Sequence, residues 1–99
     1  MPSLDLPPKY QKELVKLIKE YMPDSNVWAY GSRITPSHHD TSDLDIVIQQ
    51  KKHSIDKLVD LKDAIKNSNI PILVDVMDWD LIPESFKEEI QKKHISIYP

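Results

Sequence analysis

The chain has a single glycine among its 99 residues, and that glycine ends an apolar run typical of a β-strand. Val27-Trp28-Ala29-Tyr30 precedes Gly31, and Ser32 and Arg33 follow it. Because glycine has no Cβ atom, it permits backbone conformations and close approaches that other residues resist. We therefore expect Gly31 to lie where the backbone turns tightly or passes close to a ligand.

Two aspartates follow this turn at alternate positions of another apolar run. Asp43 and Asp45 enclose Leu44, and the run continues through Ile46 to Ile48. Successive side chains of a strand point to opposite faces of its sheet, so the two carboxylates share one face. The run predicts a strand with one acidic face and one apolar face.

The remaining pattern predicts a small α/β fold. Helical spacing of apolar residues, a first-turn proline and an N-cap serine at Ser54 mark the helices, and β-branched runs mark the strands. The predicted elements in chain order are a helix over 8–21, strands over 27–30 and 43–48, a helix over 55–66, a strand over 72–77, a helix over 83–93, and a tail or edge strand over 95–98. We expect a mixed sheet with the helices on one face and the acids on the other.

Two further expectations concern the last helix. Phe86 and Ile90 are predicted to point inward, as their helical spacing suggests. Asp78 and Asp80 are predicted to cap this helix rather than bind a metal.

Asp75 is a third informative carboxylate because it interrupts the apolar run 72–77, where an ionised side chain needs a partner. If this strand lies beside the strand of Asp43 and Asp45, three carboxylates converge on one face. Two charges 4 Å apart repel by about 4 kcal/mol at an effective dielectric constant of 20. A divalent cation removes that repulsion, and carboxylates combined with substrate phosphates suit Mg²⁺.

These features together predict a site for nucleotidyl transfer. The backbone N–H at Gly31 and the hydroxyl of Ser32 would hold outer phosphates beside the acids. Two Mg²⁺ ions would clamp the attacking and leaving oxygens of an in-line displacement, with pyrophosphate leaving. Taken alone, Gly31-Ser32 is more often a turn, Asp43-Leu44-Asp45 a strand entrance, and Asp75 an ion-paired structural acid.

Composition limits the remaining function classes. A net charge of −3 argues against direct nucleic-acid binding, which needs a basic surface. No apolar run approaches the roughly 20 residues that span a bilayer, and no signal-peptide pattern is present. Without cysteine there is no thiolate metal site. We expect one domain over residues 1–99, in the cytoplasm and not at a membrane.

The order of these residues resembles the nucleotidyltransferase superfamily of DNA polymerase β. Its pattern is Gly-Ser, about ten residues, Asp-x-Asp, and a third acid on a later strand. Here Gly31-Ser32, ten intervening residues, Asp43-Leu44-Asp45 and then Asp75 match it. The short chain and the Gly-Ser-Arg opening resemble the minimal nucleotidyltransferases (MNT), which are commonly encoded beside a HEPN-domain partner as a toxin–antitoxin pair.

The resemblance implies roles for individual residues. Gly31 and Ser32 would hold the phosphates of ATP, with help from Arg33 and Ser42. The metal ligands would be Asp43, Asp45 and Asp75, and Asp75 would also help activate the acceptor hydroxyl. Family members often continue Gly-Ser-Arg with Ala-Arg-Gly, whereas this chain has Ile34-Thr35-Pro36, which puts nucleotide affinity and rate in question.

Two functions remain open at this point. The first is an Mg²⁺-dependent enzyme that transfers AMP from ATP to a hydroxyl, by resemblance a tyrosine, of a HEPN-type toxin in a hetero-oligomer. The second is an antitoxin that neutralises its partner by contact alone. An antibiotic-modifying adenylyltransferase would need a further acceptor-binding domain, for which 99 residues leave no room.

Overall fold

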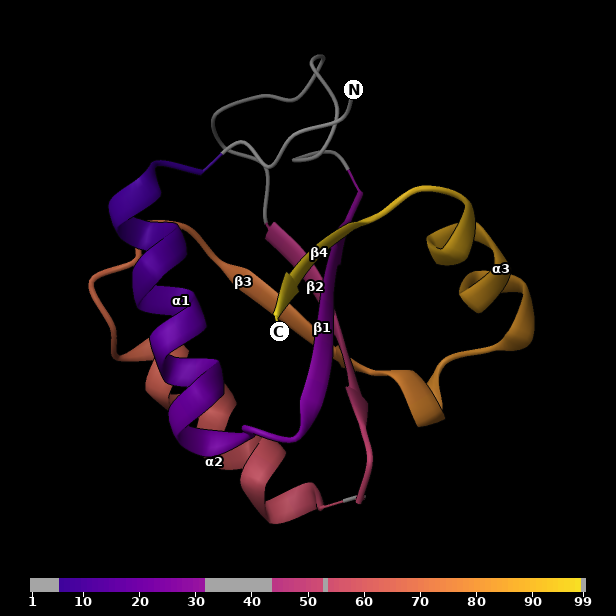
Figure 1. Cartoon of the computed structure of the whole chain (residues 1–99), viewed down its shortest axis with the longest axis horizontal. Coiled ribbons are helices and arrows are strands. Elements are labelled where there is room, and N and C mark those ends of the chain that lie inside the picture. The colour runs from indigo at the N-terminus through magenta and orange to yellow at the C-terminus, as the bar shows by residue number, and fades with distance from the viewer. Residues whose placement is uncertain (1–5, 32–43, 53, 99) are drawn as a thin grey trace.

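The structure, a computed structural model, describes residues 6–31, 44–52 and 54–98. The order of its elements agrees with the order predicted from the sequence (Figure 1). They are α1 (Pro8–Tyr21), β1 (Ser25–Tyr30), β2 (Leu44–Gln50), α2 (Ile55–Lys66), β3 (Val74–Asp78), the short 3₁₀ helix η2 (Trp79–Leu81), α3 (Glu84–Lys92) and β4 (Ile95–Tyr98). No helix within these ranges has the length and apolar character needed to cross a membrane.

The strands form one mixed sheet in the order β3-β2-β1-β4. β1 runs antiparallel to both β2 and β4, whereas β2 and β3 run parallel with α2 as their crossover. The tail predicted over 95–98 is therefore an edge strand beside β1. A mixed sheet was predicted, and this topology confirms it.

Local signals explain where the helices begin. α1 starts at a proline, which loses no hydrogen bond in the first turn of a helix. α2 starts after Ser54, whose hydroxyl accepts a hydrogen bond from the backbone N–H of Lys57 at 3.3 Å. The predicted N-cap at Ser54 is thus confirmed.

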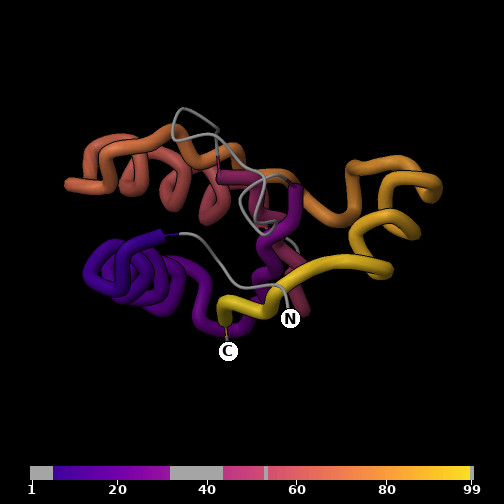
Figure 2. The backbone as a smooth tube through the Cα atoms, turned by 90° about the horizontal axis from the view of Figure 1, so that it is seen from above, coloured from indigo at the N-terminus to yellow at the C-terminus, as the bar shows by residue number. Residues whose placement is uncertain are grey.

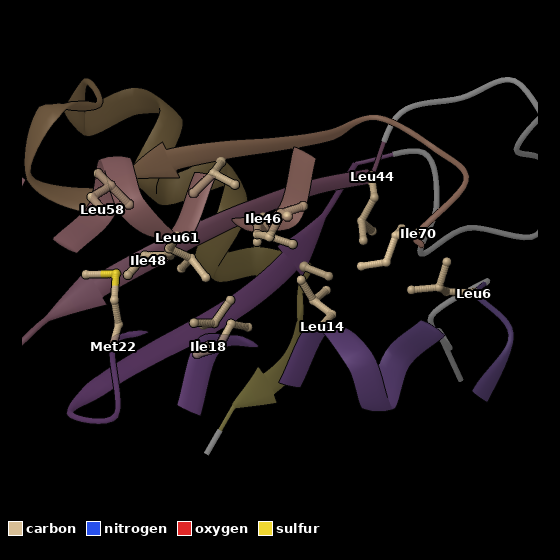
Figure 3. Close-up of a cluster of buried hydrophobic side chains, with 14 residues drawn as sticks. Leu6, Leu14, Ile18, Met22, Leu44, Ile46, Ile48, Leu58, Leu61 and Ile70 are labelled. Atoms are coloured by element: carbon tan, nitrogen blue, oxygen red, sulfur yellow. The ribbon is translucent and has the colours of Figure 1, made fainter. Parts of the chain in front are cut away.

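The main core lies between the sheet and the two helices α1 and α2 (Figure 2). Alternate residues of β2 point toward apolar residues of both helices, so the apolar face predicted for this strand is confirmed (Figure 3). The buried members of this cluster are Leu6, Leu14, Ile18, Met22, Val27, Ala29, Leu44, Ile46, Ile48, Leu58, Leu61, Ile65, Ile70 and Val76.

The third helix departs from the prediction that all helices share one face. Ile90 of α3 and Ile82 pack against Val47, which lies on the same side of β2 as Asp45. α3 therefore lies across the sheet from α1 and α2 (Figure 2). Ile90 is buried as predicted, and the ring of Phe86 turns toward Tyr30 of the sheet as predicted, although 37% of Phe86 remains exposed.

Asp78 caps a different helix from the one predicted. Its carboxylate accepts a hydrogen bond from the backbone N–H of Asp80 at 3.0 Å and so caps η2. α3 instead begins after Pro83, which provides no side-chain cap. The prediction that Asp78 and Asp80 cap the last helix is therefore wrong, because a short 3₁₀ helix capped by Asp78 intervenes before α3.

Candidate functional site

The turn after β1 explains the single glycine. Gly31 has φ of +85°, a conformation that side chains with a Cβ atom adopt only with strain. A Cβ placed on Gly31 would lie 2.6 Å from Oδ2 of Asp45. The predicted tight turn is confirmed, and the group that approaches the backbone closely is the carboxylate of Asp45.

Asp45 and Asp75 are direct neighbours in the sheet. The parallel register of β2 and β3 pairs their Cα atoms, and neighbouring strands are about 4.8 Å apart. Paired residues of adjacent strands point to the same face, so both carboxylates lie on the face opposite the main core. Asp45 is half-buried and Asp75 is exposed. The predicted convergence is therefore confirmed for these two acids.

Tyr30 completes this group, although the sequence analysis did not single it out. It pairs with Asp45 across β1 and β2, and only 9% of it is exposed. Burial, followed by the negative charges of Asp45 and Asp75, raises the pKa of Tyr30 from 10.0 to about 12. The hydroxyl remains protonated at neutral pH, and its pKa responds to the charges of both carboxylates. No local pattern in the sequence indicates Tyr30, because its place beside the acids depends on the antiparallel register of β1 and β2.

Aromatic rings pack the same face around this group. The ring of Tyr30 meets that of Phe86 edge-on at 5.6 Å between centroids. Further along β1, Trp28 stacks on His94 at 3.9 Å and meets Trp79 edge-on at 5.6 Å. These contacts tie α3 and η2 to the sheet and support the strands that carry Tyr30 and Asp45.

Four of the predicted site residues lie outside the described residues. They are Ser32, Arg33, Ser42 and Asp43. Within the described ranges, no group of three or more acidic, histidine or cysteine side chains is positioned to hold a metal ion. Asp45 and Asp75 are two of the three acids in the predicted metal site. The third, Asp43, lies two residues before Asp45 in the sequence.

Two hollows lie away from the centre of this acid group. One, of about 380 Å³, lies at the far end of the β1–β2 pair and is lined by Lys51, Lys52 and Lys57 among others. The other, of about 450 Å³, follows β3 on the side of α2 and reaches Asp75. Only the second adjoins an acid of the candidate site.

Comparison with known proteins points to one family. The model of the polymerase beta nucleotidyltransferase family matches residues 12–99. A relative from Haemophilus influenzae, named Probable protein adenylyltransferase MntA, is 36% identical over 83 residues. That match covers 82% of this chain and 72% of the relative.

Solved structures share the fold at lower sequence identity. A toxin–antitoxin crystal structure with AMP-PNP matches with a TM-score of 0.74 and 17% identity, covering 89% of this chain and 72% of that one. An MNT antitoxin in complex with a tri-AMPylated HEPN toxin of Shewanella oneidensis matches with a TM-score of 0.66 and 14% identity, covering 89% and 68%. With the family model spanning nearly the whole sequence, this chain belongs to the polymerase beta nucleotidyltransferase family.

Proposed function

We propose that this chain is an Mg²⁺-dependent protein adenylyltransferase that transfers AMP from ATP to a tyrosine of a HEPN-type toxin and thereby acts as its antitoxin. One observation carries the chemistry: Asp45 and Asp75 lie side by side at the end of the strand pair where Gly31 turns against Asp45. The named activity of the 36% identical relative and the AMPylated toxin bound to a similar MNT fold support the acceptor.

The acid group fits a divalent cation by its chemistry. Burial, followed by the negative charges of Asp45 and Asp75, raises the pKa of Tyr30, so the charges of both neighbouring carboxylates act at this hydroxyl. Oxygen ligands of this kind suit Mg²⁺, which would be held by Asp45 and Asp75 together with Asp43. When bound, Mg²⁺ supplies charge neutralisation for the phosphates and for the leaving pyrophosphate.

The residues of the chain would divide the remaining work. Gly31 leaves the backbone open for an ATP phosphate at the turn, assisted by Ser32, Arg33 and Ser42 in the sequence that surrounds it. Asp75 accepts the proton of the acceptor hydroxyl, whose oxygen then bonds to the α-phosphorus of ATP. The bond from that phosphorus to the bridging oxygen breaks, and pyrophosphate carries the electron pair away.

The partner follows from similarity. The 36% identical relative is named a protein adenylyltransferase, and a similar fold is bound to an AMPylated HEPN toxin. A protein partner of this kind would bring its acceptor to the exposed Asp75. Because the donor is ATP, we place this reaction in the cytoplasm. AMP on a tyrosine of a nuclease adds bulk and negative charge, which oppose the entry of an RNA phosphate.

Co-expression with a HEPN-type toxin, the partner proposed here, tests the proposal. Mass spectrometry of that partner should show one or more AMP additions, which disappear when Asp43→Asn replaces the wild type. Ser32→Ala should reduce the modification less severely, since it removes one phosphate contact and no acid. A partner that is silenced but unmodified would overturn enzymatic action and favour inhibition by contact alone.

A further inference from the structure

The strand that carries Asp75 lies at an edge of the sheet. Among the described residues, β3 pairs with β2 alone. The backbone N–H of Leu44 donates to the carbonyl of Leu73 at 2.9 Å, so alternate residues from Leu73 onward direct their backbone groups toward β2. By this alternation, Val74 and Val76 direct their N–H and C=O groups to the outer edge. Such an edge can accept an added extended segment.

The hollow along this edge joins apolar and basic groups. Its volume is about 450 Å³, and Leu73 on its wall is 73% exposed. Lys62 and Lys66 of α2 line the same hollow and are exposed. Asp75, the acid that the proposed function places at the acceptor hydroxyl, also lines this edge, and its carboxylate points to the face of the sheet opposite α2.

We propose that this hollow binds the acceptor segment of the partner toxin: an extended, acidic stretch that presents its tyrosine to Asp75. The proposal rests on the proposed function, since it assumes a protein acceptor. An acceptor hydroxyl can reach the exposed Asp75 from the outer edge of β3 without displacing Gly31 or Asp45 on the inner strands. The edge therefore supplies a path that stays separate from the turn where ATP would bind.

Charge selects which segment fits this path. Lys62 and Lys66 attract acidic side chains flanking the tyrosine, whereas the neutral tyrosine hydroxyl is the group suited to lie beside the carboxylate of Asp75. Leu73 offers an apolar contact for the tyrosine ring or its neighbour. A basic segment would instead meet two lysines, and an apolar helix would leave the outer backbone groups of Val74 and Val76 unpaired.

Charge reversal on α2 tests this path with a control from the same helix. The double variant Lys62→Glu, Lys66→Glu should raise the KM for the HEPN partner by about tenfold or more, because two attractions become repulsions. Its kcat and its affinity for ATP should stay near those of the wild type. Lys57→Glu, which lines the other hollow, should leave all three values unchanged.

The apolar wall offers a second matched pair. Leu73→Ser should raise the KM for the partner, since it removes the exposed leucine beside Asp75. Val59→Ser, at a 49% exposed position of α2 outside the hollow, should not. Circular dichroism and melting temperature of each variant separate a folding defect from a binding defect.

The outcomes distinguish this proposal from the proposed function. If the Lys62 and Leu73 variants modify the partner with wild-type KM while Asp45→Asn is inactive, the docking path is wrong and the enzyme remains. If the wild type transfers no AMP, the docking path is tested by calorimetric titration of the partner into the wild type and the lysine variants. Binding weakened by the double lysine variant but not by Lys57→Glu would support the path, and equal binding by both would overturn it.

Discussion

The two faces of the sheet differ in what fills them. On one face, fourteen buried residues form a continuous core beneath α1 and α2. On the other, the buried apolar cluster among the described residues consists of Tyr30, Val47, Ile82 and Ile90, with aromatic rings at their margin. Because successive side chains of β2 alternate between these faces, Ile46 packs in the core while its neighbour Asp45 lies beside Asp75 in the candidate site.

This difference separates the stability of the fold from its chemistry. The core face buries apolar area, which is the main favourable contribution to folding. The acid face keeps two carboxylates adjacent, an arrangement that repels without a cation. Substitutions on the two faces should therefore affect different measurements, and the following predictions test that separation.

The largest effect is expected from Asp45→Asn on the acid face. The change keeps the size of the side chain but removes a charge that would hold Mg²⁺, so the rate of AMP transfer should fall by about a thousandfold or more. The melting temperature should change little, because Asn matches the size of Asp and the apolar core on the other face is untouched. Transfer of radiolabelled AMP and thermal melts measure the two quantities. Wild-type turnover by this variant would contradict the assignment.

Leu61→Ala on the core face should have the opposite profile. Leu61 of α2 is fully buried, and its truncation should lower the free energy of unfolding by about 2–5 kcal/mol. Activity per folded molecule should change little at low temperature. Urea unfolding measures the loss, and Val59→Ala at a half-exposed position of the same helix is the matched control. Equal losses in both variants would show that α2 does not anchor the core.

Gly31→Ala should cost activity more than stability. The added methyl group meets Oδ2 of Asp45 at 2.6 Å, so the carboxylate must move, and a shift of about 1 Å can reduce a rate by about a hundredfold. Strain from the positive φ adds about 1–2 kcal/mol. Steady-state kinetics and urea unfolding of the variant measure these effects. Unchanged kinetics would show that the close approach to Asp45 is irrelevant to catalysis.

The smallest effect concerns the titration of Tyr30. Its pKa in the folded chain, about 12, exceeds the ordinary value of 10.0, so its contribution to stability is complete below pH 10.0 and is lost as the pH rises through about 12. Asp75→Asn removes one nearby charge and should lower this pKa. The absorbance of tyrosinate during alkaline titration measures it, with Tyr30→Phe assigning the signal. An unshifted titration would place Asp75 too far from Tyr30 to interact.

The sequence predicted most of the element order because alternation and helical spacing are local. It also predicted that Asp45 and Asp75 converge, although this required assuming that their strands are neighbours. It missed Tyr30, because its role depends on the antiparallel register with Asp45 and not on any local pattern. It misplaced α3, since an amphipathic helix is compatible with either face and the packing of Ile90 on Val47 decides which.

Boundaries were less predictable than elements. β3 begins at Val74, whereas the apolar run begins at Ile72, because pairing with β2 rather than apolar character defines the strand. The short helix η2 was also not predicted. It is capped by the hydrogen bond from the backbone N–H of Asp80 to the carboxylate of Asp78, and the spacing of apolar residues does not reveal such a bond.

The position of β4 has a consequence for the order in which the chain can fold during synthesis. β1 pairs with β4, so one edge of β1 stays unpaired until residues 95–98 are available, whereas β2 and β3 are complete by Asp78. A nascent chain can therefore bring Asp45 beside Asp75 before the partner strand of β1 has left the ribosome. Until Ile95 to Tyr98 emerge, β1 offers an open edge to other nascent chains.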